Sequence, residues 1–164
     1  MKISLIVIVY LVLALPLKAQ ESPDAFIKYF NECVNIYNSP EGRDIKLKIF
    51  QDDRNETNFY NVYFLEKSPY RFKVRIQAYE YIEPMEGWID KDCIAVYSRS
   101  RQEEIHLYDA PSCDSKYQVL KNVPDIFTVV DYMGIWRKVL FIMEAKLYIG
   151  WTKDYCPIVY NSCS

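Results

Sequence analysis

Residues 87–97, Gly-Trp-Ile-Asp-Lys-Asp-Cys-Ile-Ala-Val-Tyr, decide the fold, because a matching stretch returns at residues 150–160 as Gly-Trp-Thr-Lys-Asp-Tyr-Cys-Pro-Ile-Val-Tyr. Glycine, tryptophan, cysteine, valine and tyrosine fall at the same positions of both stretches. A phrase of the form Tyr-x-x-Pro precedes each copy, at residues 37–40 and 108–111. Two ordered matches per copy indicate an internal duplication. The chain is therefore predicted to contain one module twice.

The N-terminus has the pattern of a secretory signal peptide. Lys2 precedes a run from Ile3 to Leu15 that is apolar apart from Ser4, and the small residue Ala19 stands before a polar segment. The run is shorter than the roughly 20 residues that cross a hydrocarbon core, so a cleaved signal at residues 1–19 is favoured over an uncleaved membrane anchor. The mature protein is expected to be exported, to the periplasm or the extracellular space, without a membrane span.

Charge and composition narrow the class of protein. The net charge is −2 from 20 basic and 22 acidic residues, and removal of Lys2 and Lys18 with the signal makes it −4. A nucleic-acid partner would require a basic face, so none is expected. Aromatic residues make up 16% of the chain, with 15 tyrosines, and this enrichment favours strands.

Alternating apolar and polar residues predict strands rather than helices. The run 45–49 alternates most plainly, and the run 70–76 follows the same pattern. Residues 91–93 are predicted to form a tight turn. No run of ten residues has the helical period. The predicted fold class is all-β, with about five short strands in each copy.

The duplication sets the predicted domain boundaries. Residues 20–32 form a lead-in whose start, Ser22-Pro23-Asp24, suits a short helix or an irregular segment. The first copy is assigned to residues 33–97 and the second to residues 105–164. The polar run 98–104 is the natural linker between them.

The motifs resemble those of bacterial SH3-like (Src-homology-3-like) domains of exported proteins. These domains carry a Tyr-x-x-Pro turn, a middle strand of the Trp-x-Lys-Val type, matched at residues 136–139 and less faithfully at 71–74, and a closing Gly-Trp strand. The resemblance implies two tandem small SH3-like β-barrels over nearly the whole mature chain. The first copy lacks the middle tryptophan, and a cysteine after Gly-Trp is not usual in the family.

Cysteines predict disulfides, because exported proteins meet an oxidising environment. The five candidates are Cys33, Cys93, Cys113, Cys156 and Cys163. The odd number leaves one thiol over, and the spacing alone does not fix the pairing. In a small barrel the first and last strands are neighbours, which favours Cys33 with Cys93. Cys156 is expected to pair with Cys113 or with Cys163.

Catalysis is not expected from this sequence. His106 is the only histidine, and in a predicted strand it faces opposite to Ile105 and Leu107, as a surface histidine does. The sequence contains no glycine-rich phosphate loop, nucleophile elbow or metal-ligand cluster. The interpretation is a non-enzymatic protein without metal or cofactor.

Aromatic side chains are the candidate ligand-binding groups. Such side chains offer flat surfaces to an extended peptide. Trp88 and Trp151 occupy matched positions and are equally explained by maintenance of the fold. The expected partner is a peptide or cell-wall component, or another envelope protein; the alternative is an interaction or inhibitory protein whose two copies pack as one rigid body. The candidates are Tyr37, Trp88, Tyr97, Tyr108, Trp136, Trp151 and Tyr160.

Overall fold

The structure, a computed structural model, describes residues 22–28, 33–50, 60–77, 84–98 and 104–157. These segments form 13 strands and one 3-10 turn, and every pairing between strands is antiparallel. The prediction of an all-β fold is confirmed. In the described segments, no helix has the length and apolarity that a membrane crossing requires.

Seven strands occupy the first half of the chain. They are β1 (Ala25–Ile27), β2 (Cys33–Tyr37), β3 (Ile45–Phe50), β4 (Asn61–Lys67), β5 (Arg71–Gln77), β6 (Met85–Asp90) and β7 (Ile94–Ser98). The predicted tight turn is the 3-10 turn Lys91–Cys93, which joins β6 to β7. Six strands follow: β8 (Glu104–Tyr108), β9 (Tyr117–Lys121), β10 (Ile126–Met133), β11 (Trp136–Met143), β12 (Lys146–Thr152) and β13 (Tyr155–Cys156).

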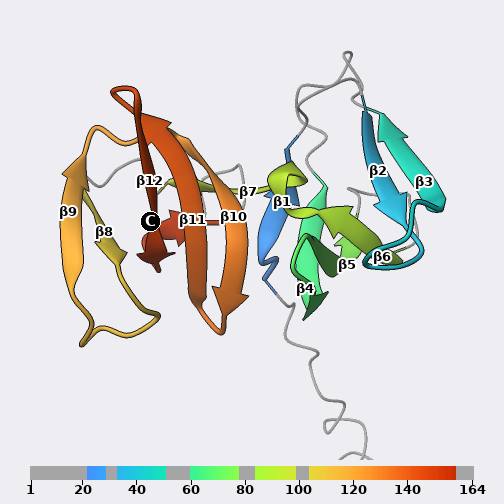
Figure 1. The fold of residues 1–164 in the computed structure, drawn as a ribbon, viewed down its shortest axis with the longest axis horizontal. Helices are drawn as coiled ribbons and strands as arrows, with labels where there is room; N and C mark the ends of the chain where they lie inside the picture. The colour runs from blue at the N-terminus through green and yellow to red at the C-terminus, as the bar shows by residue number, and fades with distance from the viewer. Residues whose placement is uncertain (1–21, 29–32, 51–59, 78–83, 99–103, 158–164) are drawn as a thin grey trace, which may run out of the picture.

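The order of strands repeats with a period of six. The sheet runs β3-β2-β6-β5-β4-β1-β7-β10-β11-β12-β8-β9, and β13 pairs with β7. The pairs β2–β3, β2–β6, β4–β5 and β5–β6 recur as β8–β9, β8–β12, β10–β11 and β11–β12. The pairs of β1 with β4 and β7 recur as those of β7 with β10 and β13. Strand β7 therefore ends the first repeat (β1–β7) and begins the second (β7–β13), and Figure 1 shows it running from one to the other.

The registers of the two repeats also agree. Tyr37 lies opposite Trp88 on β6, and Tyr108 lies opposite Trp151 on β12. The middle pairs of strands each carry a bulge, between Phe64 and Glu66 in β4 and at the matching point of β10. Matching registers define equivalent positions, so each residue of the second repeat can be compared with its counterpart in the first.

Close approach of two strands explains the repeated glycines. A Cβ atom on Gly87 would lie 2.3 Å from Ile36 Cγ2, and one on Gly150 would lie 2.5 Å from Leu107 Cγ. Ile36 and Leu107 are equivalent residues on β2 and β8, and both are buried. A side chain at either glycine would push the Tyr-x-x-Pro strand away from the Gly-Trp strand.

Alternation along the middle strands builds the core. Phe72, Val74 and Ile76 of β5 are buried, while the residues between them are partly exposed. Strand β11 repeats this pattern with Val139 and Phe141, but a buried arginine, Arg137, stands where the first repeat has Phe72.

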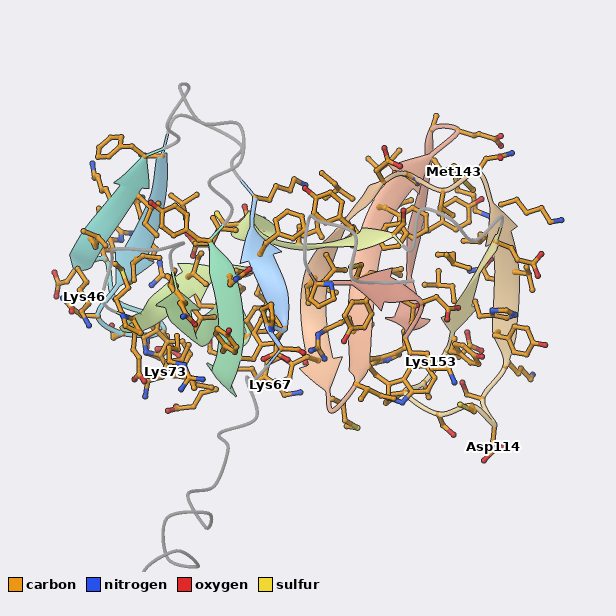
Figure 2. All side chains as sticks on the ribbon, turned by 180° about the vertical axis from the view of Figure 1, so that it is seen from behind. Lys46, Lys67, Lys73, Asp114, Met143 and Lys153 are labelled. Atoms are coloured by element: carbon orange, nitrogen blue, oxygen red, sulfur yellow. The ribbon has the colours of Figure 1, made fainter. Side chains whose placement is uncertain are left out.

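The bulged strands bring the repeats into contact. Phe64 of β4 stacks on Tyr132 of β10 with ring centroids 4.3 Å apart. Lys67 Nζ lies 2.8 Å from a carboxylate oxygen of Asp131, and Figure 2 shows Lys67 at the junction of the two repeats. The repeats are therefore joined by side chains as well as by the strand that they share.

The lead-in differs from the helix considered for residues 20–32. Ala25–Ile27 is a strand that pairs with β4 on one side and with β7 on the other. All three residues are fully buried. A strand satisfies its backbone groups through these two neighbours and buries both of its faces, which one turn of helix at this place could not do. Residues 29–32 lie outside the described segments.

The predicted Cys33–Cys93 disulfide is wrong for this structure, because both residues are free thiols. Strand β2 is flanked by β3 and β6, whereas β7, which follows Cys93, is flanked by β1, β10 and β13. The prediction assumed that β2 and β7 are neighbours, but β7 pairs with β1 instead. Cys113 is also a free thiol, which leaves Cys163 as the candidate partner of Cys156, and Cys163 lies outside the described residues.

Candidate functional site

Ring side chains gather on the outward face of the second repeat. Tyr108 meets Trp136 edge to face at a centroid distance of 5.1 Å and Tyr117 at 5.1 Å. The imidazole of His106 meets Tyr117 at 5.2 Å. We call these four residues, His106, Tyr108, Tyr117 and Trp136, the aromatic cluster. Contacts of this geometry are favourable between ring quadrupoles.

Strands β8, β9 and β11 position the aromatic cluster, with Trp136 on β11. His106 and Tyr108 alternate on β8 with the buried Ile105 and Leu107, so both face away from the core. Tyr117 opens β9 directly opposite Tyr108. The side chains differ in accessibility, since Tyr117 is 55% exposed whereas Tyr108 is 8% exposed. The cluster thus has an open platform at Tyr117 and a largely covered centre at Tyr108.

A cationic side chain borders the aromatic cluster. Lys153 Nζ lies 5.8 Å from the ring centre of Trp136 and 3.3 Å from Cys113 Sγ. The hydrogen bond to the Cys113 sulfur is the main cause that raises the pKa of Lys153, and a lysine is positively charged at neutral pH. In Figure 2, Lys153 and Asp114 lie toward the same end of the second repeat. The site therefore joins ring surfaces to a fixed positive charge.

The carboxylate of Asp154 fixes the position of His106, the only histidine of the chain. The Asp154 Oδ2 atom accepts a hydrogen bond from the His106 backbone N–H at 3.0 Å and lies 3.2 Å from its Nδ1. A Cys–His pair would require a thiol beside this imidazole. The free thiol of Cys113 instead has Lys153 Nζ as its hydrogen-bond partner. The arrangement orients the His106 ring beside Tyr117, and among the described residues the hydrogen-bond partner of this ring is Asp154.

The equivalent surface of the first repeat is closed. The guanidinium carbon of Arg71 lies 3.5 Å from the ring centre of Tyr37, and its Nε donates to Asp90 at 2.7 Å. The same guanidinium donates to the carbonyl oxygens of Ser39 and Gly42 at 3.1 and 2.6 Å. Register places Arg71 at the position of Trp136, and Asp90 at that of Lys153. An ion pair thus covers the tyrosine in one repeat, whereas rings border it in the other.

The predicted site residues are spread over both repeats. Tyr108 and Trp136 are in contact, and Trp151 lies opposite Tyr108 but is only 8% exposed. Trp88 is half-buried opposite Tyr37. Tyr97 lies on the shared strand β7 and stacks on Phe26 at 4.5 Å. Tyr160 lies outside the described residues.

Sequence reasoning missed the polar half of the site. Tyr117, Lys153 and Asp154 were not among the predicted site residues. Alignment of the two Gly-Trp stretches could have indicated Lys153, because it stands where the first copy has the acidic Asp90. The residue pair beside it, Arg71 and Trp136, also differs in chemical type between the copies. Among the described residues, no group of three or more His, Cys, Asp or Glu side chains could hold a metal ion.

Comparison with known proteins gives a weak likeness to a solved structure. No protein-family model matches the chain, and no curated protein matches it in sequence. The solved structure of NlpC2 from Trichomonas vaginalis is similar to this chain at a TM-score of 0.29 and 15% sequence identity. The alignment covers 80% of this chain and 46% of that protein, so this chain spans about half of its length. A TM-score this low does not establish a shared fold.

Proposed function

We propose that this protein is a non-catalytic, exported binding module of the bacterial envelope that takes an extended peptide across the aromatic cluster. In this proposal each repeat is an SH3-like unit, in which the strand before the Tyr-x-x-Pro turn pairs with the Gly-Trp strand and a three-strand meander completes the sheet. The resemblance of the sequence motifs to exported bacterial domains supports the location.

A single observation carries the proposal, which is the contrast between the two repeats at equivalent positions. The first repeat fills its surface with Arg71, whose guanidinium is fixed by one carboxylate and two carbonyl groups. The second repeat places Trp136 there, in contact with Tyr108, and Tyr117, which also contacts Tyr108, is more than half exposed. Aromatic side chains bind extended peptides through stacking with little loss of conformational entropy. At these equivalent positions, the second repeat presents ring surfaces where the first presents an ion pair.

The charges of the site favour a peptide that carries a carboxylate. Lys153 borders Trp136, while the nearby carboxylate of Asp154 is already engaged by His106. An incoming carboxylate would gain a charge-assisted hydrogen bond from the ammonium group. Cell-wall peptides combine an extended backbone with free carboxylates, so a cell-wall peptide is the ligand class that we propose.

Sedimentation with purified peptidoglycan tests the proposal. The mature protein should bind saturably, and Trp136→Ala should weaken binding at least about tenfold, which corresponds to about 1.4 kcal/mol. The matched control is Arg71→Ala, which alters the equivalent position of the closed repeat and should leave the affinity unchanged. Both variants must be folded, with a thermal unfolding midpoint close to that of the unaltered protein. No binding by the unaltered protein, or equal binding by both variants, would overturn the proposal.

A second candidate is an interaction or inhibitory protein in which both repeats act as one body. The observation that favours it is the junction, where an aromatic stack and the Lys67–Asp131 ion pair join the repeats. Chemical cross-linking in envelope extracts, followed by mass spectrometry, would then identify one protein bound through both repeats. Cross-links from the second repeat alone would reject this candidate.

A further inference from the structure

A thiol and an amine lie in contact beside the aromatic cluster. Lys153 Nζ lies 3.3 Å from Cys113 Sγ, although 40 residues separate the two in the chain. Cys113 is an exposed free thiol, whereas the free thiols of Cys33 and Cys93 are partly buried. Sulfur and amine nitrogen are both nucleophiles in their unprotonated forms. The surface of the second repeat thus brings together two groups of complementary redox chemistry.

The loop that carries Cys113 is held in place by its own hydrogen bonds. At its base, the Asp109 backbone N–H donates to the Lys116 carbonyl oxygen at 2.9 Å. Within it, the Ala110 backbone N–H donates to Ser115 Oγ at 3.3 Å, and this hydroxyl donates to the Ala110 carbonyl oxygen at 3.0 Å. The backbone at Cys113 is therefore fixed relative to β8 and β9.

Lys153 also lies in a fixed turn. The backbone N–H of the next residue, Asp154, donates to Thr152 Oγ1 at 3.0 Å, and Thr152 is fully buried. The Asp154 carboxylate accepts the His106 backbone N–H at 3.0 Å. The backbones on both sides of the contact are anchored, and lysine carries its amine on a flexible four-carbon stem. A bond between Nζ and Sγ therefore requires side-chain rotation alone.

The first repeat connects the same two places by an ion pair. Gly42 and Cys113 each stand two residues after the proline of their Tyr-x-x-Pro phrase, and Asp90 stands at the position of Lys153. Arg71 donates to the Gly42 carbonyl oxygen at 2.6 Å and to the Asp90 carboxylate at 2.7 Å. The second repeat keeps this connection between loop and turn, but makes it from a sulfur and a nitrogen, which an oxidant can join.

We propose that Cys113 and Lys153 form a covalent Sγ–Nζ bond, a sulfenamide, when the protein meets a peroxide. The sulfur first attacks a peroxide oxygen: an S–O bond forms, the O–O bond breaks, and the other oxygen leaves as water. Sulfur is oxidised by two electrons to a sulfenic acid, and the peroxide is reduced. The amine then attacks the sulfur: the S–N bond forms, the S–O bond breaks, and the oxygen leaves as water with a proton from the amine. The chain loses one hydrogen from sulfur and one from nitrogen.

The contact suits both steps of this reaction. Before oxidation, the hydrogen bond to the Cys113 sulfur and, after it, the charge of that sulfur raise the pKa of Lys153 and favour its ammonium form. Conversion to a neutral sulfenic acid removes the thiolate charge, so Lys153 then releases its proton more readily. Only the unprotonated amine attacks. The first step therefore prepares the nucleophile of the second.

The bond would change the charge of the aromatic cluster. Lys153 Nζ lies 5.8 Å from the ring centre of Trp136, and a sulfenamide nitrogen is neutral. The oxidised protein would keep its ring surfaces but lose the cation that favours a carboxylate. Formation of the bond does not rest on the proposed function, whereas this effect on peptide binding does.

Peptide mapping of the mature protein after treatment with hydrogen peroxide tests the proposal. The peptides that contain Cys113 and Lys153 should appear as one species, about 2 Da lighter than the sum of the same peptides from untreated protein. Trypsin should fail to cleave after Lys153, because it requires a free ammonium group there. Dithiothreitol should restore cleavage by reducing the S–N bond. Sulfenic or sulfinic acid at Cys113 with normal cleavage after Lys153 would overturn the proposal.

Conservative variants at exposed positions identify the amine. Lys153→Arg keeps the positive charge, but a guanidinium stays protonated, so the link should be lost and dimedone should instead label the sulfenic acid of Cys113. Lys116→Arg alters a lysine in the loop of Cys113 and is the matched control, which should retain the link. Both variants should keep the thermal unfolding midpoint of the unaltered protein. A link that persists in Lys153→Arg or disappears in Lys116→Arg would assign the amine to another residue and overturn the proposal.

Sedimentation with peptidoglycan measures the effect on the aromatic cluster. The oxidised protein should bind about threefold more weakly or worse than the reduced protein. Cys113→Ser, which cannot form the link, should bind equally with and without peroxide treatment. Equal binding by the linked and unlinked forms of the unaltered protein would overturn the effect on binding. No binding by either form would contradict the proposed function instead, because the peptide map alone decides whether the bond forms.

Discussion

Arg137 and Asp24 form a buried ion pair that ties the lead-in strand to the second repeat, with Nη2 and Oδ1 2.5 Å apart. The side chain of Arg137 is only 3% exposed, and its Nη1 donates to the carbonyl oxygens of Gly134 and Trp136. The second carboxylate oxygen of Asp24 accepts the backbone N–H of Phe64, at the bulge of the first repeat. One carboxylate thus links three parts of the fold.

Removal of that carboxylate should therefore destabilise the whole molecule. Asp24→Ala leaves Arg137 buried without its partner, and loss of one partner of a buried pair costs several kcal/mol. Because Asp24 is one-third exposed, we expect a loss of about 2–4 kcal/mol in the free energy of unfolding. Urea denaturation measures it, with Asp114→Ala on an exposed loop as the control.

A double substitution separates the pair from its individual members. Asp24→Ala/Arg137→Leu replaces the buried charge by an apolar residue, as the first repeat does with Phe72. The double variant should be more stable than Asp24→Ala alone, because no unpaired charge remains in the core. If the two single losses add without any recovery, the pair is not the source of the stability.

The contrast between Arg71 and Trp136 predicts that the binding surface can be moved. Trp136→Arg/Lys153→Asp installs the ion pair of the first repeat over Tyr108 and should weaken peptidoglycan binding at least about tenfold without unfolding the protein. The reciprocal variant, Arg71→Trp/Asp90→Lys, should open the surface at Tyr37. Isothermal titration with soluble peptidoglycan fragments should then find two sites per chain in place of one. A single site of unchanged affinity in both variants would contradict the proposed role.

Local patterns made part of this fold predictable. The Gly-Trp and Tyr-x-x-Pro stretches mark equivalent strands because each glycine admits a close neighbour, Ile36 or Leu107. Alternation along β5 and β11 likewise reflects which side chains are buried. Tyr108 and Trp136 were predicted as site residues, since both belong to these recurring motifs.

Features that depend on distant pairing were not predictable from the sequence. Strand β1 has only three residues and exists because β4 and β7 both pair with it. Strand β7 pairs with β1 and not with β2, whose expected proximity suggested the Cys33–Cys93 disulfide. The burial of Arg137 follows from Asp24, which is 113 residues away in the chain. No local signal reports a partner at that separation.

The Lys67–Asp131 pair predicts acid lability at the junction of the repeats. Burial acts to raise the pKa of Asp131, but hydrogen bonds from Lys67 and from the Tyr132 backbone N–H outweigh it and hold the pKa below its usual value. A carboxyl whose pKa is lowered by folding stabilises the protein above its unfolded pKa, near about 4, and this stability is lost as the pH falls through the folded value. Asp131→Asn should flatten this dependence.

The expected effect is small, because both side chains are at least one-third exposed and water screens the pair. We expect a difference of at most about 1 kcal/mol between Asp131→Asn and the unaltered protein at pH 6, and less at pH 3. Urea denaturation over this pH range measures it, with Asp114→Asn as the matched surface control. An equal slope for both variants would assign the acid lability to other groups.

The thiol of Cys93 should react slowly with alkylating reagents, although it forms no disulfide. Burial, reinforced by the charges of Asp92 and Asp90, raises its pKa to about 12. The thiolate is the reactive form, so at pH 8 alkylation should be about a thousandfold slower than for an ordinary cysteine. Iodoacetamide labelling followed by peptide mass spectrometry should modify the exposed Cys113 well before Cys93.

Two comparisons identify the cause of this slowness. In 8 M urea both cysteines should react at similar rates, because unfolding removes the burial that raises the pKa of Cys93. Asp92→Asn removes a negative charge beside the thiol, so it should lower the pKa and speed the reaction of the folded protein severalfold. The raised pKa also means that folding favours the protonated thiol, so stability is complete below pH 9 and declines as the pH rises toward 12. Cys93→Ala should reduce that alkaline decline, and an unchanged decline would show that other groups, such as the buried tyrosines, cause it.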